Sequence, residues 1–270
     1  MYIINIILQL VGLAILTKIL NYIEYFYRMI YNTTKLNNFL ETENLYIITN
    51  DFCKCKNLEI YNYTLFTYKC NSCRIKRIID FEKEKQVYQL LSNIKNKVKF
   101  IIHTHGGESE LPNFLTYILK QNKIYVETYI PQIALSAGTF IALSSNVIYM
   151  NWYSAMGPID TQLSYSESVD EDYEETFSAK FIKTIKNKEN GLTKLQSLEA
   201  DSVHNDDLFI LNKIFKTKKC NKIIKNLLES NRSHSIRYGP KDLETFGLNV
   251  KVGISDDIQE MFDIFLSINK

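Results

Sequence analysis

The chain contains 270 residues, of which 46% are hydrophobic and 23% are charged, with only 9 Gly and 4 Pro. This composition excludes a disordered or collagen-like chain and fits one domain of roughly 200 residues with additional segments. Lys and Arg total 32 against 30 acidic residues, a net charge of +2 without a basic block, so we expect no nucleic-acid partner.

The N-terminal segment is mostly apolar, and its polar interruptions up to residue 23 are Asn5, Gln9, Lys18 and Asn21. About 20 apolar residues cross the hydrocarbon core of a bilayer, so this run just meets the length criterion. No basic stretch precedes it and no small-residue cleavage site follows it, which argues against a removable signal peptide. The pattern predicts a membrane helix.

This predicted transmembrane or membrane-associated helix covers residues 1–30. Lys18, Arg28 and Lys35 all lie toward its carboxyl side, so the positive-inside tendency predicts a single-pass protein whose body is cytosolic. The alternative is an amphipathic helix that packs on the body or lies in the membrane interface.

Four of the five cysteines form two close pairs: Cys53 and Cys55 as CxC, and Cys70 and Cys73 as CxxC. The intervening residues, 56–69, are rich in Ile, Tyr, Phe and Thr, which is typical of a β-hairpin. Such a hairpin can present four thiolates to a structural Zn²⁺, with no ligand position left for substrate. In an oxidising compartment two disulfides are the better interpretation, and four unrelated thiols remain an alternative.

We therefore expect a linker with a four-cysteine hairpin over residues 31–80 and the main domain over residues 81–270. In that domain, residues 98–104 form a continuous apolar run, which is typical of a buried strand, and a Gly-Gly pair follows it. Apolar residues then recur at helical spacing over 108–121, and residues 124–130 predict a second strand. This strand-helix-strand order indicates an α/β fold.

Ser136 lies just before the next predicted helix, which runs to about residue 145 and is followed by a strand at 147–150. The small residues after it, Ala137 and Gly138, allow close packing where the helix begins. Unpaired N–H groups and the helix dipole favour developing negative charge at such a position. A serine there is well placed to attack a carbonyl group.

The glycine pair, Gly106 and Gly107, has a matching role, because a Gly-Gly turn can bring backbone N–H groups against a ligand without an intervening side chain. The amides of Gly107 and Ala137 could form an oxyanion hole that stabilises an acyl-transfer transition state by several kcal/mol. In the alternative interpretation the glycines form an ordinary turn and Ser136 is a routine helix N-cap.

Three blocks carry a family resemblance: IIHTHGG at 101–107, ALSAGTFIAL at 134–143 and AMGPIDTQ at 155–162. They resemble the serine dehydrogenase proteinase family, relatives of signal peptide peptidase A within the Clp/crotonase superfamily, where the blocks read approximately HTPGG, SGGT with IALAAD, and LGPVDPQ. His105 replaces the proline of the first block and Ala137 the first glycine of the second, and neither change removes a backbone donor.

The resemblance implies an α/β fold, a Clp/crotonase-like ββα spiral, here with the N-terminal membrane helix and the small Cys-bearing hairpin. It also implies a serine peptidase with Ser136 as the nucleophile and Gly107 as an oxyanion donor. An N-terminal anchor suits that family, whose helices after the catalytic blocks build oligomer contacts, so we expect a homo-oligomer.

The general base is left open by the sequence. A histidine some two dozen residues after Ser136, the Clp-type solution, is absent, and the peptidase A solution is a lysine whose pKa is lowered by burial. Lys180 and Lys183 are the nearest downstream candidates, and we take Lys180 as the catalytic one. Both could instead be solvated surface lysines. The other titratable candidates are His103, His105, His204 and His234.

Two further groups of titratable residues receive structural roles. Asp160 is expected to fix the turn of the third block rather than to titrate in catalysis. Asp201, Asp206 and Asp207, with His204, could indicate a metal site, but such a group is more often a solvated helix face, which we expect here in the helical region that starts at residue 192.

The sequence thus predicts a membrane-anchored serine endopeptidase that acts on peptide or membrane-protein substrates and needs no catalytic cofactor. A catalytically inactive scaffold or binding protein of the same fold is the alternative, which the missing obvious base favours. No P-loop or GxGxxG fingerprint is present, so nucleotide hydrolysis and dehydrogenase chemistry have no support.

Overall fold

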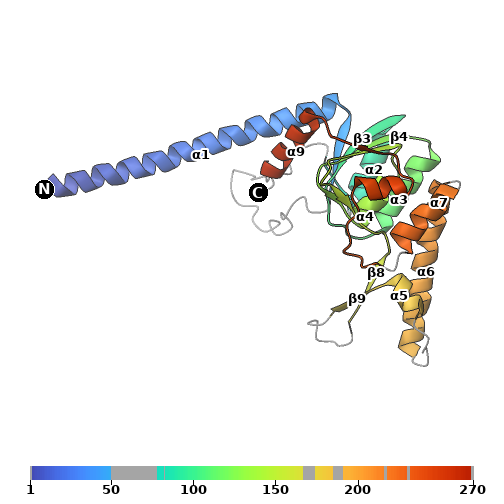
Figure 1. Cartoon of the computed structure of the whole chain (residues 1–270). Helices are drawn as coiled ribbons and strands as arrows, with labels where there is room; N and C mark the ends of the chain where they lie inside the picture. Colours follow the sequence, from blue (N-terminus) through green and yellow to red (C-terminus); the bar gives the residue numbers. More distant parts are fainter. Residues whose placement is uncertain are drawn as a thin grey trace.

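A six-stranded parallel sheet forms the centre of the protein (Figure 1). The structure is a computed structural model that describes residues 2–49, 78–81, 83–166, 174–184, 191–215, 218–229 and 232–268. The strands, in their order across the sheet, are β10 (Val250–Val252), β6 (Val147–Met150), β4 (Tyr125–Ile130), β3 (Lys97–Ile102), β1 (Leu45–Thr49) and β2 (Ile78–Asp80). This arrangement confirms the α/β class.

Helices cover both faces of the sheet, as an all-parallel sheet requires. Phe100 and Ile102 of β3 belong to one apolar cluster together with residues of α2 (Glu84–Asn93), α3 (Glu110–Gln121) and α4 (Ala137–Ala142). Ile101, which points the other way, belongs to a second cluster with residues of α1 (Tyr2–Thr42) and α9 (Asp256–Ile268). The continuous apolar run of β3 is therefore explained by burial on both faces.

Residues 36–49, which we expected in a linker, contribute to this core. Leu36 and Leu40, at the end of α1, are fully buried against α9, and all five residues of β1 are buried. Strand β1 pairs in parallel with β3 on one side and β2 on the other. The apolar sequence of β1, LYIIT, explains why it enters the sheet rather than a linker.

The prediction of a single-pass membrane protein is wrong. In the described part of the chain, no helix is long and apolar enough to cross a membrane. The long helix α1 extends away from the body in Figure 1, and its apolar run is interrupted by Lys18, Asn21, Glu24 and Arg28. These polar and charged groups make this part of α1 too polar for the hydrocarbon core of a bilayer.

The predicted cysteine hairpin lies outside the described residues, so zinc binding by Cys53, Cys55, Cys70 and Cys73 stays a prediction. The described residues contain no group of three or more His, Cys, Asp or Glu side chains that could hold a metal ion. Cys220 is buried, and burial raises the pKa of its thiol.

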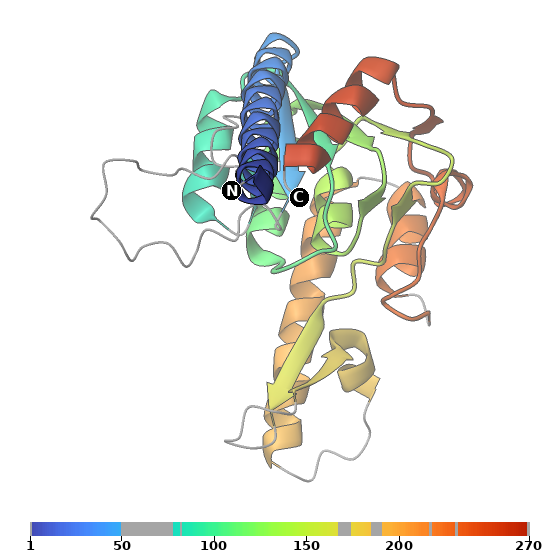
Figure 2. The ribbon, with the colours of Figure 1, turned by 90° about the vertical axis from the view of Figure 1, so that its left-hand side faces the viewer.

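A second part of the chain projects from the body in Figure 2. It contains the antiparallel hairpin of β8 (Gln162–Ser166) and β9 (Glu174–Ser178), then α5 (Ala179–Thr184) and α6 (Gly191–Ile214). Helix α5 packs on the N-terminal half of α6 through Ala179, Ile182 and Ala200, and the C-terminal half of α6 contacts α3 in the body. The projecting hairpin, α5 and the N-terminal half of α6 are called the arm below.

The remaining elements complete the body. A two-stranded parallel pair joins β5 (Ile133–Ala134) to β7 (Ala155–Met156). After α6 come α7 (Lys218–Ile223), the π-helix η3 (Ile224–Leu228) and α8 (Pro240–Thr245). Helix α8 begins after Gly239, whose amide donates to Asp242 Oδ2 over 3.1 Å.

Candidate active site

Ser136 lies on a strained turn between β5 and α4. Its backbone has φ 49° and ψ −115°, a conformation that a residue with a Cβ rarely adopts and that costs about 1–3 kcal/mol. Its side chain makes no capping hydrogen bond to α4. Ser136 thus occupies the N-cap position of α4 but does not cap the helix as a routine N-cap serine does, and the turn resembles the sharp strand-to-helix turns that present nucleophiles.

The glycine turn after β3 packs directly against Ser136. A Cβ atom on Gly106, whose φ is 113°, would lie 2.8 Å from Ser136 Cβ and 3.3 Å from the carbonyl oxygen of Leu135. The amide of Gly106 donates to Thr104 Oγ1 over 3.0 Å, and the amide of Leu135 donates to the carbonyl oxygen of Thr104 over 3.1 Å. These two bonds at Thr104 fix the glycine turn and the serine turn relative to each other.

The start of helix α4 also packs closely against Thr104. A Cβ on Gly138 would lie 2.3 Å from Thr104 Cγ2, so only glycine fits there without movement. Thr139 Oγ1 donates to the carbonyl oxygen of Ala134 over 2.6 Å and accepts from the amide of Gly157 over 3.0 Å. Small residues at the start of α4 therefore hold the helix against the end of β3, as the sequence predicted.

A cavity of about 590 Å³ opens beside Ser136. The serine and both predicted oxyanion donors, Gly107 and Ala137, line it. In the described part of the chain, the amides of Gly107 and Ala137 donate no hydrogen bond to another backbone group. The complete lining is Gly107, Glu108, Ser109, Glu110, Ser136, Ala137, Phe140, Ile159, Thr161, Gln162, Leu163, Glu199 and Asp207.

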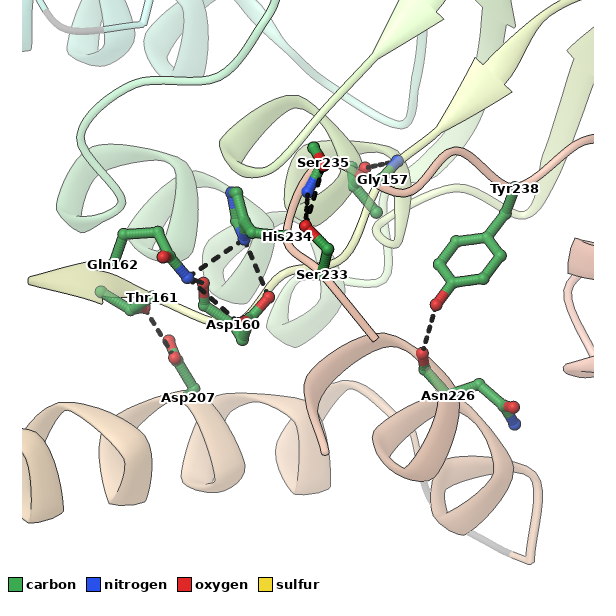
Figure 3. A network of polar contacts seen from close by, with 11 residues as sticks. Gly157, Asp160, Thr161, Gln162, Asp207, Asn226, Ser233, His234, Ser235 and Tyr238 are labelled. Carbon is green, nitrogen blue, oxygen red and sulfur yellow. Dashed lines mark hydrogen bonds and ion pairs between the residues drawn. The ribbon is translucent and has the colours of Figure 1, made fainter. Parts of the chain in front are cut away.

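Helix α6 forms another wall of this cavity and contributes Asp207. Asp207 is 2% exposed, and its carboxylate accepts hydrogen bonds from Thr161 Oγ1 over 2.8 Å and Asn113 Nδ2 over 3.3 Å. Figure 3 shows the carboxylate rising from the helix toward Thr161. Burial raises the pKa of Asp207 to about 6, although both hydrogen bonds oppose the shift.

The two lysine candidates lie on α5 in the arm, and neither lines the cavity. Lys180 is half-buried, and Lys183 Nζ lies 3.5 Å from Asp201 Oδ1 in an ion pair. Among the described residues that line the cavity there is no Lys, Arg or His. The structure therefore brings Ser136, Gly107 and Ala137 together without placing Lys180 on the same wall.

Three histidine candidates lie in different surroundings. The ring of His103 packs edge-on against Phe262, with 5.2 Å between centroids, and Phe262 belongs to the cluster on the α9 side of the sheet. His105 is exposed beside the glycine turn. His204 is buried on α6, where burial and then the charge of Lys183 lower the pKa of its imidazole.

The fourth histidine, His234, belongs to a polar network behind the cavity wall (Figure 3). Its Nδ1 lies 2.8 Å from Asp160 Oδ1, and Gln162 Nε2 donates to Asp160 Oδ2 over 3.1 Å. Asp160 is 4% exposed and stands between Ile159 and Thr161, which line the cavity. Asp160 thus ties this loop to the segment before α8, a positioning role like the one expected from the sequence.

The expectation of a solvated acidic face on α6 is wrong for Asp207 and His204. The buried positions of this helix recur at intervals of three and four residues, and most of them are small or polar: Ser197, Ala200, His204, Asp207 and Leu211. Leu195 and Leu198 are 65% and 58% exposed. The sequence signal for the burial of Asp207 was this spacing of three and four residues, because it places Asp207 on the same helix face as Ala200 and Leu211.

Solved structures and curated proteins offer distant similarities. Two uncharacterized proteins of Methanocaldococcus jannaschii are 23% identical over 171 residues and 22% identical over 176 residues. Each match covers 62% of this chain and 56% or 58% of the relative, so the chain spans less than two thirds of their length.

Among the solved structures, a mutant of the 1510-N membrane-bound stomatin-specific protease in complex with a substrate peptide is 14% identical, with a TM-score of 0.44. That match covers 80% of this chain and 78% of the other. ClpP1 from Listeria monocytogenes is also 14% identical, with a TM-score of 0.38, over 64% of this chain and 84% of the other.

The family assignment comes from a sequence model rather than from these distant similarities. The model of the ClpP-like SDH-type serine proteinases matches residues 67–268, which include Ser136, the glycine turn and the whole of α6. Because these residues make up most of the chain, the chain belongs to the family of ClpP-like SDH-type serine proteinases.

Proposed function

We propose that the protein is a serine endopeptidase in which the Ser136 hydroxyl attacks the carbonyl carbon of a peptide bond. One observation carries this proposal: Ser136 is held on a strained turn, makes no capping bond, and shares a cavity with the amides of Gly107 and Ala137. A strained backbone at a cavity wall is a common feature of catalytic nucleophiles.

In the proposed reaction, the bond between Ser136 Oγ and the substrate carbonyl carbon forms as a base removes the hydroxyl proton. The carbonyl oxygen then carries negative charge, which the amides of Gly107 and Ala137 would stabilise. Collapse of this intermediate releases the amine, which takes up the proton, and water hydrolyses the resulting ester on Ser136.

Lys180 is the proposed base, by the lysine mechanism that the family resemblance implies. It lies on α5, which follows the β8–β9 hairpin, and the cavity lining includes Gln162 and Leu163 at the start of that hairpin. The proposal therefore requires the arm to bring Lys180 closer to Ser136 when substrate is bound. Active-site contacts commonly tighten in this way on substrate binding.

A catalytically inactive scaffold that binds peptides is the second candidate function. One observation favours it: no Lys, Arg or His stands among the described residues lining the cavity. Without a base the Ser136 hydroxyl is a poor nucleophile at neutral pH.

Self-association is part of the proposal for either function. The exposed face of α6 carries Leu195 and Leu198, and the arm carries Phe177 and Phe181, whose rings stack with 6.0 Å between centroids while both remain exposed. Apolar residues gathered on a projecting element are typical of protein contacts. We propose that the arm joins copies of the chain into a homo-oligomer.

Hydrolysis of a mixture of internally quenched fluorescent peptides tests the peptidase function. We expect the wild type to cleave the mixture and Ser136→Ala to lose at least about a thousandfold in rate, with Ser92→Ala, an exposed serine of α2, as the matched control. Lys180→Ala should lower the cleavage rate by a comparable factor, whereas Lys241→Ala should leave the rate unchanged. A folded wild type without activity would favour the scaffold.

A further inference from the structure

The cavity beside Ser136 is lined by acidic residues. Glu108, Glu110, Glu199 and Asp207 all line it, and the described lining contains no cationic side chain. The whole chain carries a formal charge of +2, so this lining does not reflect an acidic composition. Clefts lined by one sign of charge concentrate ligands of the opposite sign.

Asp207 lies at the junction of this cavity with a second one, of about 540 Å³, which it also lines. Although Asp207 is 2% exposed, its hydrogen-bond donors in the described structure, Thr161 and Asn113, are both neutral. A carboxylate has room for about four hydrogen bonds, and a buried one is costly without an opposite charge. A cation from a ligand would offset that cost.

Asn113 supplies a second, independent observation at the same junction. This residue is 8% exposed and lines the second cavity, and its Oδ1 has no hydrogen-bond partner in the described part of the chain. A buried acceptor without a donor costs free energy, so such an atom beside a carboxylate marks a place for a ligand with several N–H groups. Ammonium and guanidinium groups have that property.

The remaining lining suits the stem of such a side chain. Phe140, Ile159 and Leu163 line the cavity beside Ser136 and provide apolar contact. Lysine and arginine combine a chain of methylene groups with a charged end, so they bury the stem against apolar walls and pair the end with an acid.

We propose that the cavity beside Ser136 binds a lysine or arginine side chain of the peptide substrate, with Asp207 holding its positive charge. The inference rests on the proposed function, because it names the substrate class of the same cavity. It predicts a binding preference that does not require turnover.

Binding to the full-length Ser136→Ala variant tests this proposal separately from hydrolysis. Isothermal titration calorimetry would compare four acetylated, amidated hexapeptides of Ala and Gly that differ at one central residue: Lys, Arg, norleucine or Glu. We expect the Lys and Arg peptides to bind at least about tenfold tighter than the norleucine peptide, and the Glu peptide to bind weakest. When Asp207→Asn is combined with Ser136→Ala, the preference for Lys and Arg peptides should disappear. Asp256→Asn in the same background, an exposed change on α9, should leave that preference intact.

Equal binding of the four peptides, or no binding of any of them, would overturn the inference. If the Asp207→Asn protein fails to fold, Glu110→Gln replaces it, because Glu110 is exposed, lines both cavities and should weaken the preference by a smaller factor. Preference for a cationic peptide without hydrolysis by the wild type would contradict the peptidase but support this inference. Hydrolysis at rates that do not depend on the charge of the substrate would support the peptidase but contradict this inference.

Discussion

The two walls of the cavity differ in how the chain builds them. On one wall, the glycine turn and the serine turn come from segments about 30 residues apart, and Thr104 joins them through two hydrogen bonds. On the other wall, Asp207 comes from α6 and depends on Thr161 and Asn113, 46 and 94 residues away. The first wall is a packed motif, and the second exists only after distant elements have docked.

Because the two walls are built differently, substitutions on them should affect the stability of the protein in different ways. The serine wall is held by close backbone contacts, so it should tolerate almost no added volume. The acidic wall contains a buried carboxyl that opposes folding when ionised, which is a common feature of functional groups. Substitutions on the two walls should therefore have effects of opposite sign on stability.

Gly138→Ala should have the largest effect, because the new Cβ would lie 2.3 Å from Thr104 Cγ2. Both atoms belong to buried residues, so relief requires movement of α4 or β3, and overpacking of this kind costs at least about 1–3 kcal/mol. Urea unfolding monitored by circular dichroism measures the loss. Gly239→Ala is the matched control, since its Cβ would meet nothing closer than 3.9 Å, and an equal loss in both variants would contradict the packing argument.

Gly106→Ala should lower the rate of peptide cleavage about a hundredfold, at a smaller cost in stability than Gly138→Ala. The φ of 113° strains any residue with a Cβ, and the new atom would displace Ser136, whose Cβ would lie 2.8 Å away. A displacement of about 1 Å can lower a rate about a hundredfold. Peptide cleavage and urea unfolding measured on the same preparation test this pair of effects. A stable and fully active variant would show that the glycine turn does not position Ser136.

Asp207→Asn should stabilise the protein at pH 7, the opposite sign to the two glycine variants. The pKa of Asp207 is about 6 in the folded protein and ordinarily 3.8, so the folded state binds this proton more tightly than the unfolded chain does. The stability contributed by the protonated form is present below about pH 4 and is lost as the pH rises through about 6. The difference between these two pKa values corresponds to a change of at most about 3 kcal/mol in the free energy of unfolding.

Urea unfolding at pH 4, 5, 6 and 7 would measure this dependence. The wild type should lose stability relative to Asp207→Asn over that range, whereas the neighbouring exposed change Asp206→Asn should follow the wild type. Parallel curves for wild type and Asp207→Asn would show that Asp207 is not destabilised by burial.

Asp160→Asn should have the smallest effect, a loss of about 1–2 kcal/mol in the free energy of unfolding. The substitution removes the charge from a hydrogen bond of 2.8 Å to His234, which is 30% exposed at its side chain, while the bond to Gln162 can persist. Urea unfolding at pH 7 measures the loss. If His234→Ala lowers the free energy of unfolding by the same amount, and the double variant lowers it no further than either single variant, the two residues act together.

The sequence predicted the first wall because its determinants are local. An apolar run identified β3, the glycine pair marked its end, and small residues after Ser136 indicated close packing. Each of these features follows from backbone geometry within a few residues.

The second wall could not be predicted in the same way. The sequence predicted that Asp207 and His204 lie on a solvated face of α6, but both are buried, whereas the apolar Leu195 and Leu198 are exposed. Which face of a helix is buried depends on what docks against it, and the partners of Asp207 lie in other elements. The membrane prediction for α1 failed for a different reason: it relied on the length of the apolar run, and no membrane-spanning helix is found in the described part of the chain.

Labelling by a fluorophosphonate probe, followed by peptide mapping, tests whether Ser136 is a nucleophile, because this reagent modifies serine hydroxyls that act as nucleophiles. We predict that the wild type is labelled at Ser136, that an excess of competing peptide substrate slows the labelling, and that Ser136→Ala remains unlabelled. A folded wild type that carries no label at Ser136, or that is labelled at another serine, would contradict this prediction.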